Sequence, residues 1–217
     1  MTREDSWSAD WACERVIAHE DIKEANVIGP HQISLAVKKL PRTVTVGTMS
    51  VPVITGKDID EVYRPGNEFI LNIKKGPLIE HDAIVRSEQT PFGLGGVGDL
   101  YRAANDKEFK TYLPKETQFI LRALNQHSEV ESVCRINNRM YQITRMNGSE
   151  LRILALNEYD LTADAIRSGI DRFGKCNAIL ASNPNCDITS EAKEVAKNCD
   201  AALFKIGQLL GALKGGF

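Results

Sequence analysis

The sequence predicts an α/β protein built from two similar modules, each a mixed β-sheet packed between helices. One observation is Asn177–Leu213, which has the pattern of a buried strand, a turn, a helix, a short strand and a helix. A second is that this stretch, shifted back by 109 positions, aligns without a gap with Phe69–Ala103. We interpret the match as a pseudo-repeat, although apolar helices also match by chance. The identical residues are apolar apart from one glycine pair: Ile70/Ile179, Leu71/Leu180, Ile79/Ile188, Ala83/Ala192, Leu94/Leu203, Gly98/Gly207, Leu100/Leu209 and Ala103/Ala212.

The first module is expected to occupy residues 1–108. Apolar residues at helical spacing predict an opening helix, which Gly29-Pro30 ends. Runs of alternating valine and threonine, interrupted by Pro41 and Gly47, predict an antiparallel three-stranded meander. The expected elements are a helix over 11–25, strands over 32–37, 43–48 and 51–55, a helix over 57–63, a strand over 69–73, a helix over 79–88, a short strand or glycine-rich turn over 90–96, and a helix over 97–105.

The second module is expected to occupy residues 109–217, after a charged linker over 106–112 that lacks a core pattern. Asn147-Gly148 is typical of a type I′ hairpin turn. Strands joined by a helix should pair in parallel. The expected elements are a helix over 115–126, strands over 131–136, 139–146 and 149–156, a helix over 161–173, a strand over 178–181, a helix over 188–198 with Asp187 or Thr189 as its N-cap, a strand over 201–205, and a helix over 206–213.

Composition excludes several classes of protein. A net charge of −2 gives no global signal for nucleic acid or membrane, so any basic surface must be local. No apolar run approaches the roughly 20 residues of a membrane span, and the N-terminus lacks a secretory pattern. The five cysteines are odd in number and include no CxxC, which favours reduced thiols over disulfides or a zinc site. We therefore expect a cytoplasmic protein without membrane contact.

The end of the second module resembles the Mrr-type branch of the restriction-endonuclease-like PD-(D/E)XK fold. The residues that carry the resemblance are Thr189, Glu191, Ala192 and Ala196 on one helix, the short strand 202–204, and Leu209, Leu210 and Leu213 on the closing helix. The order of a helix, a three-stranded meander and alternating helices and strands is similar too. Through the pseudo-repeat, the resemblance extends to much of the first module.

The resemblance implies a metal-dependent nuclease site that this chain lacks in both modules. The family places an acid on the second core strand and an E-x-K or Q-x-K on the third, and the acids bind Mg²⁺. The first module has no Asp or Glu between Ala25 and Lys57. The second module offers Glu150, Glu158 and Asp160 but no E-x-K or Q-x-K. We expect degenerate sites without a resident metal, and a Mg²⁺ site at these three acids only in the alternative that a nuclease activity remains.

Basic residues supply the candidate nucleic-acid contacts. In the first module these are Lys38, Lys39, Arg42 and Lys57, accompanied by His31, Lys74 and Lys75. In the second module Arg139 and Arg145 share strand parity and should point to one face. Arginine suits phosphate well, but lysines also keep a strand edge solvated. Both interpretations remain open at this point.

A glycine-rich segment, Gly93–Asp99, is a weaker candidate. A flexible turn between strand and helix accounts for it, and nucleotide binding at the helix N-terminus is the alternative. The four histidines show no metal-ligand spacing.

Together these features favour a non-catalytic protein of nuclease-like fold that binds DNA or RNA, or docks a partner in a restriction or phage-conflict system. One alternative is a Mg²⁺-dependent nuclease acting from the second module. Another is a structural or assembly protein, in which a protein partner or a homo-oligomer takes the place of nucleic acid.

Overall fold

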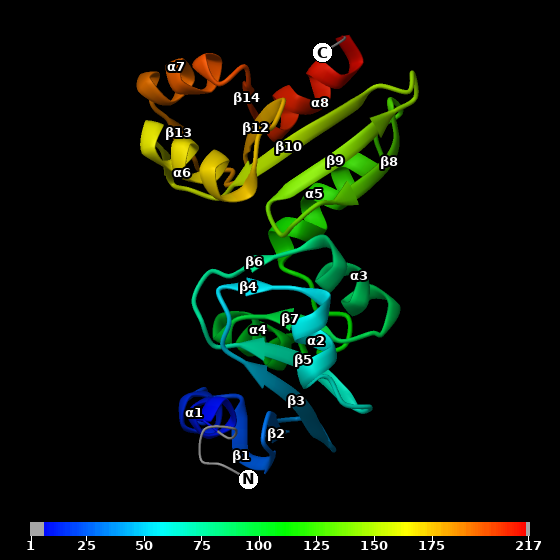
Figure 1. Cartoon of the computed structure of the whole chain (residues 1–217), viewed down its shortest axis with the longest axis vertical. Coiled ribbons are helices and arrows are strands. Elements are labelled where there is room, and N and C mark those ends of the chain that lie inside the picture. Colours follow the sequence, from blue (N-terminus) through cyan, green and yellow to red (C-terminus); the bar gives the residue numbers. More distant parts are fainter. Residues whose placement is uncertain (1–6, 216–217) are drawn as a thin grey trace. The chain divides into compact units, whose positions relative to one another are not determined.

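The computed structural model describes residues 7–215 (Figure 1). The chain divides into two compact units, 1–114 and 115–217. The expected boundary at 108/109 falls before the observed one. The segment that sequence patterns assign to a linker is part of the first unit, because Phe109 lies in that unit's core with 2% of its surface exposed and Tyr112 packs beside it.

The first unit is an α/β fold around a five-stranded mixed sheet. Its strands follow the order β1-β2-β3-β5-β7. β1, β2 and β3 pair antiparallel, whereas β5 is parallel to β3 and β7 is parallel to β5. A separate parallel pair joins β4 to β6. The elements are α1 (Trp7–Val16), β1 (Ile22–Gly29), β2 (Gln32–Val37), β3 (Thr43–Met49), β4 (Val53–Ile54), α2 (Gly56–Val62), β5 (Asn67–Asn72), β6 (Leu78–Ile79), α3 (His81–Gln89), β7 (Gly93–Gly95) and α4 (Val97–Asp106).

Helices cover both faces of this sheet. One core cluster joins α1 and α4 to Val44, Val46 and Phe69 of the sheet. The other joins α2 and α3 to Met49 and Ile70, which point to the opposite face. All six residues of β5 are buried, as expected for a strand that is covered on both sides.

The start of the first unit differs from the sequence prediction. The predicted helix over 11–25 is wrong beyond Val16, because residues 22–29 form β1, and Gly29-Pro30 belongs to the β1–β2 hairpin instead of ending a helix. β1 is an edge strand with mostly exposed side chains, so it lacks the alternation that identifies a strand. The predicted strand over 51–55 is a connection that contains only the two-residue β4.

The second unit has the same order of helices and strands and the same sheet plan. Its strand order, β14-β12-β10-β9-β8, has antiparallel β8, β9 and β10 followed by parallel β12 and β14. The parallel pair β11–β13 corresponds to β4–β6. The elements are α5 (Lys115–Asn125), β8 (Val130–Arg135), β9 (Met140–Arg145), β10 (Glu150–Leu156), β11 (Asp160–Leu161), α6 (Ala163–Phe173), β12 (Ala178–Ala181), β13 (Asp187–Ile188), α7 (Ser190–Asn198), β14 (Ala202–Lys205) and α8 (Ile206–Gly215).

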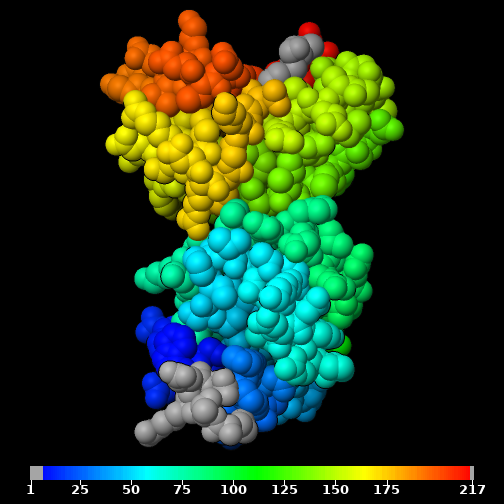
Figure 2. All heavy atoms as spheres, viewed as in Figure 1, coloured from blue at the N-terminus to red at the C-terminus, as the bar shows by residue number. Residues whose placement is uncertain are grey.

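Helix pairs again cover the two faces of the sheet. α5 and α8 share a core with the inner side chains of β8, β9 and β10, and α6 and α7 share a core on the other face. Figure 2 shows the yellow and orange atoms of α6 and α7 as one continuous surface. The predicted α/β architecture of two modules is therefore confirmed.

The β9–β10 hairpin forms as predicted, but its turn is of a different type. A type I′ turn needs positive φ at both central residues. Gly148 has a φ of 79°, whereas the non-glycine residues with positive φ in the described chain are Lys39, Lys107 and Asp200, so Asn147 is not among them. The Gly148 amide donates to the Arg145 carbonyl at 2.8 Å. The connection is a three-residue loop with its glycine in the left-handed region.

One turn has the same hydrogen bonds in both units. His19 follows α1, and its Nδ1 accepts from the Asp21 amide at 3.3 Å. His127 follows α5, and its Nδ1 accepts from the Glu129 amide at 3.2 Å. In both turns the next residue, which opens the following strand, donates its amide to the histidine carbonyl. The two histidines therefore hold equivalent positions.

Across residues 7–215, no helix combines the length and apolar character needed to span a membrane.

Candidate functional site

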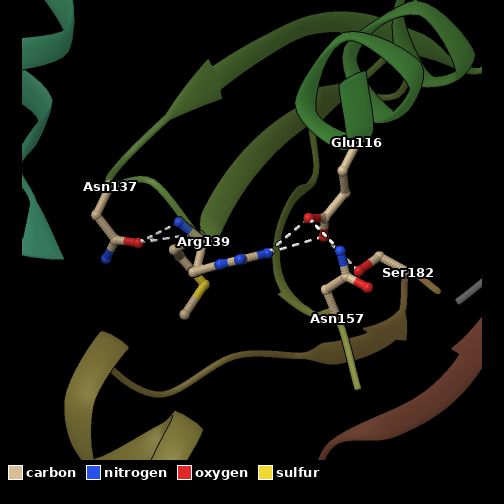
Figure 3. Close-up of polar contacts among 6 residues, drawn as sticks. Glu116, Asn137, Arg139, Asn157 and Ser182 are labelled. Atoms are coloured by element: carbon tan, nitrogen blue, oxygen red, sulfur yellow. Dashed lines mark hydrogen bonds and ion pairs between the residues drawn. The ribbon is translucent and has the colours of Figure 1, made fainter. Parts of the chain in front are cut away.

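A polar cluster of the second unit is centred on the carboxylate of Glu116 (Figure 3). Glu116 is the second residue of α5, and its side chain is 17% exposed. Oε1 accepts from Arg139 Nη1 at 2.8 Å and from Ser182 Oγ at 2.5 Å. Oε2 accepts from Arg139 Nη1 at 2.9 Å and from Asn157 Nδ2 at 2.8 Å. Three side chains from distant parts of the sequence therefore converge on one carboxylate.

The sheet explains why these side chains meet. Asn157 and Ser182 directly follow β10 and β12, which are parallel neighbours with Leu156 opposite Ala181. The carboxyl ends of parallel strands meet at one edge, where open α/β sheets often hold ligands. Arg139 directly precedes β9, which runs antiparallel to β10 and therefore starts at the same edge. Each side chain reaches Glu116 from the end of a different strand.

The loop before β9 is fixed by a buried asparagine. Asn137 Oδ1 accepts from the Arg139 amide at 2.9 Å and from the Met140 amide at 2.7 Å, and its Nδ2 donates to the Phe173 carbonyl at 3.2 Å. Because both ends of the side chain are used, the backbone at Arg139 is held in place. Arg139 is therefore positioned from its backbone as well as from its guanidinium group.

The cluster rests on a buried phenol. Burial raises the pKa of Tyr141 above its usual value, and the nearby Thr117 hydrogen bond and Arg135 charge oppose that shift. Tyr141 is 1% exposed and lies opposite Ile153 of β10. It therefore stays protonated at neutral pH and is a neutral member of the core that α5 and α8 form with the sheet.

Arg139 keeps unused donors on the solvent side of this cluster. Its side chain is 34% exposed, and Nη1 makes both contacts to Glu116. Within residues 7–215, Nε and Nη2 of Arg139 have no partner. An arginine that a carboxylate orients on one side can present its other N–H groups to a phosphate. The Glu116 carboxylate, by contrast, is fully engaged.

Arg145 does not join Arg139 in an exposed face. Its side chain is buried, and Nη2 donates to the Leu213 carbonyl in the last turn of α8 at 2.8 Å. A cation at this end of a helix interacts favourably with the helix dipole. Arg145 therefore has a structural position in the second unit, and the exposed pair expected from strand parity does not form.

The lysines and arginine expected in the first unit do not form one basic surface either. Lys38, Lys39 and Arg42 lie between β2 and β3, and Arg42 forms an ion pair with Glu68. Lys57 lies in α2, beyond the opposite end of β3, and faces Glu61 at 4.0 Å. The seven residues of β3 separate the two groups by about 20 Å.

The three acids of the nuclease alternative are also separated. Glu150 opens the seven-residue β10, whereas Glu158 and Asp160 follow it, so the strand places about 20 Å between them. Ligands of one Mg²⁺ ion must lie within about 2.1 Å of it. Among the described residues, no group of three or more His, Cys, Asp or Glu side chains is placed to hold a metal. The shared Mg²⁺ site proposed from these acids is therefore not formed.

Packing explains the glycine-rich segment. A Cβ on Gly93 would lie 2.4 Å from the Phe109 carbonyl oxygen, and one on Gly95 would lie 2.6 Å from Asp99. Asp99 Oδ2 accepts from the Gly96 amide at 3.0 Å and so caps α4 with its own carboxylate. An anion at this helix N-terminus would meet that negative charge, so the structure favours the turn over nucleotide binding.

A shallow groove with a volume of about 720 Å³ lies at the other end of the second sheet. It is lined by α7 and by the first residues of β10 and β14, with Lys193 and Lys197 on its rim. It contains none of the Glu116 cluster. Lys197 lies in the last turn of α7, whose free carbonyls favour a cation, so this lysine has a structural explanation.

Of the cluster, Arg139 was a predicted contact, and the sequence also places Ser182 in a turn at the carboxyl end of a strand, where ligands often bind, although the residues equally suit a plain turn. Glu116, Asn157 and Ser182 carry no motif, and a charged residue in the first turn of a helix is common. Their positions in the sequence could have identified two of them. Asn157 and Ser182 directly follow two apolar runs that are predicted to form neighbouring parallel strands. Comparisons with protein-family models, with curated proteins and with solved structures gave no significant match.

Proposed function

We propose that the protein is a non-catalytic nucleic-acid-binding protein whose second unit contacts the phosphate backbone through Arg139. The observation that carries this proposal is the Glu116 carboxylate, which accepts from Arg139, Asn157 and Ser182. Such a carboxylate has its lone pairs engaged and is poorly suited to bind a metal ion. It is well suited to orient an arginine whose remaining donors face solvent.

The position of the cluster fits the resemblance to the PD-(D/E)XK fold. That family places its acid and lysine on the second and third core strands, just before the crossover helix. Here Arg139 directly precedes the second strand of the meander, β9, and Asn157 directly follows the third, β10. An arginine and an amide therefore lie near the positions where that family has its acid and its lysine. A site that once bound a metal and now presents a cation would still face the same phosphate backbone.

We further propose that the two units arose by duplication of one module. The pairing register supports this proposal, since Ile70 lies opposite Leu94 and Ile179 lies opposite Leu203, as the sequence alignment requires. The equivalent turns at His19 and His127 also support it. Each module would then have its own candidate binding surface at the end of the sheet where the parallel strands finish.

The test is fluorescence polarisation of labelled single-stranded DNA, double-stranded DNA and single-stranded RNA over a salt series, with and without Mg²⁺. Binding should weaken steeply with salt, because each phosphate contact releases counterions. Arg139→Gln should lower the slope of log K against log salt by about 0.7 on a single strand or about 0.9 on a duplex. Arg167→Gln is the matched control, because Arg167 is an exposed arginine of α6 that pairs with Asp164 at 2.9 Å.

A second variant separates phosphate contact from a purely structural ion pair. Glu116→Gln removes a negative charge beside Arg139 but keeps an oxygen acceptor, so nucleic-acid binding should be at least as tight as in the unchanged protein. If Glu116→Gln and Arg139→Gln weaken binding equally, the pair is structural only. Cleavage of any substrate that requires Mg²⁺ would contradict a non-catalytic role. If no nucleic acid binds at low salt, the proposed function is wrong and docking of a protein partner is the remaining hypothesis.

A further inference from the structure

The first unit has a polar cluster at the place that corresponds to Glu116 and Arg139. The Thr48 amide donates to the His31 carbonyl, as the Ala155 amide donates to the Arg139 carbonyl. His31 thus occupies the position of Arg139, directly before the second strand of its sheet. Ser8 is the second residue of α1, as Glu116 is of α5.

The chemistry at this place in the first unit is different. Ser8 Oγ lies 3.0 Å from Thr48 Oγ1 and 3.4 Å from His31 Nδ1, so a hydroxyl stands where the second unit has a carboxylate. Ser8 and Thr48 are buried, and His31 is half-buried. Among residues 7–215, no carboxylate of the kind that holds Arg139 is part of this hydrogen-bonded group.

A lysine loop adjoins the cluster. The Ile73 amide donates to the Met49 carbonyl, as the Ser182 amide donates to the Leu156 carbonyl. Ile73 thus corresponds to Ser182, and the next two residues are Lys74 and Lys75. Both are exposed, and within residues 7–215 neither forms an ion pair.

This loop is held in a fixed position by a fully buried side chain. Asn72 is 0% exposed. Its Nδ2 donates to the carbonyls of Lys74 and Val51, each at 3.0 Å, and its Oδ1 accepts from the Val51 amide at 2.9 Å. A buried asparagine with these bonds restrains the backbone that carries the two lysines, so less entropy is lost when they bind a ligand.

His31 and the lysine loop are close enough to bind one anion. Three neighbouring strands bring these segments together at the same end of the sheet: His31 precedes β2, Met49 ends β3 and Ile73 follows β5. Neighbouring strands are about 4.8 Å apart, which puts the backbones of His31 and Ile73 roughly 10 Å from each other. The side chains of His31 and Lys74 can span that distance to a common phosphate group.

We propose that His31, Lys74 and Lys75 form a second phosphate-backbone contact, at the edge of the first sheet that corresponds to the Arg139 site. This inference rests on the proposed nucleic-acid function and names the residues through which the first unit takes part in it. The ligand is a phosphodiester chain. Arms with single-stranded DNA, duplex DNA and single-stranded RNA distinguish its sources.

The experiment compares two double variants of the full chain in the polarisation assay. Lys74→Gln/Lys75→Gln removes the loop charges. Lys107→Gln/Lys110→Gln removes two exposed lysines that follow α4 in the same unit and is the control for net charge. The first variant should lower the salt slope by about 1.4 on a single strand or about 1.8 on a duplex, and the control should leave it unchanged.

Equal effects of the two double variants would overturn the inference, because they would show a response to net charge alone. If Arg139→Gln weakens binding but Lys74→Gln/Lys75→Gln does not, the inference is wrong and the proposed function stands. If the unchanged protein binds no nucleic acid, the proposed function fails. The inference is then decided by titrating the ¹⁵N-labelled protein with tripolyphosphate, where shifts confined to His31, Lys74 and Lys75 support the site and their absence overturns it.

Discussion

Replacing Glu116 by alanine should destabilise the second unit selectively. The substitution removes the acceptor for Arg139, Asn157 and Ser182. A hydrogen bond to a charged group contributes a net of about 1.5–3 kcal/mol, so one such bond for each of the three donor side chains gives an upper range of roughly 4.5–9 kcal/mol. Arg139 is about one-third exposed and Asn157 is exposed, so water replaces part of what they lose. We expect a loss of about 2–4 kcal/mol for Glu116→Ala and about 1–2 kcal/mol for Glu116→Gln.

Intrinsic fluorescence allows the two units to be followed separately. The two tryptophans, Trp7 and Trp11, are both in the first unit. In urea unfolding, the transition seen by far-ultraviolet circular dichroism should move to lower denaturant for Glu116→Ala. The tryptophan transition should stay in place if the units unfold independently.

Glu194→Ala is the matched control, since Glu194 is an exposed acid of α7. The reasoning about the Glu116 cluster would be refuted if Glu116→Ala cost no more than this control, or less than about 0.5 kcal/mol, the usual limit for surface substitutions. A double-mutant cycle with Arg139→Ala adds a direct measure of the pair. Its coupling energy should be at least about 0.5 kcal/mol, as expected for residues in contact.

Three further outcomes follow from burial and packing. Burial raises the pKa of the Cys176 thiol to about 11, so at pH 8 iodoacetamide should alkylate it about a hundred times more slowly than a thiol of pKa 9. Peptide mass spectrometry should therefore find exposed Cys199 modified before Cys176. Gly93→Ala should lower the free energy of unfolding of the first unit by about 1–3 kcal/mol, because its Cβ would lie 2.4 Å from the Phe109 carbonyl oxygen. The urea midpoint of the tryptophan transition should fall accordingly, and an unchanged midpoint would contradict that contact. Gly211→Ala has open space around its Cβ and should raise the helical stability of α8 by about 0.5–1 kcal/mol, measured by circular dichroism.

The second unit was easier to predict from the sequence than the first. β12 is buried at all four residues and reads as an apolar run, and α6 ends at Gly174 as the sequence indicates. β1, in contrast, is an edge strand whose side chains are mostly exposed, so its residues continued the charge pattern of the preceding helix. Tertiary position, which local sequence does not encode, decided between helix and strand at residues 22–25.

The candidate site was harder to predict than the fold. Arg139 was identified from its charge, but its partner Glu116 comes from an element that local patterns do not connect to it. Arg145 has the same charge and strand parity, yet it is buried against the end of α8. Lys38 and Lys57 belong to one acid-free stretch of the sequence, but they lie beyond opposite ends of β3. Charge composition identified candidates, and only the topology selected among them.

The irregular register of β1 has a consequence for self-association. Among residues 7–215, β1 is the outermost strand of its sheet, and it exposes Val27 and Ile28 at 41% and 54%. A long, flat and apolar edge of this kind invites another chain to pair with it and start a fibril. The shifts between Ile22 and Glu24 and between Val27 and Gly29 interrupt the ladder at both ends, so only a short regular segment remains. The bulges therefore shorten the regular stretch of β1 with which a second chain could pair, and exposed Lys23 and Glu24 add charge to the same strand.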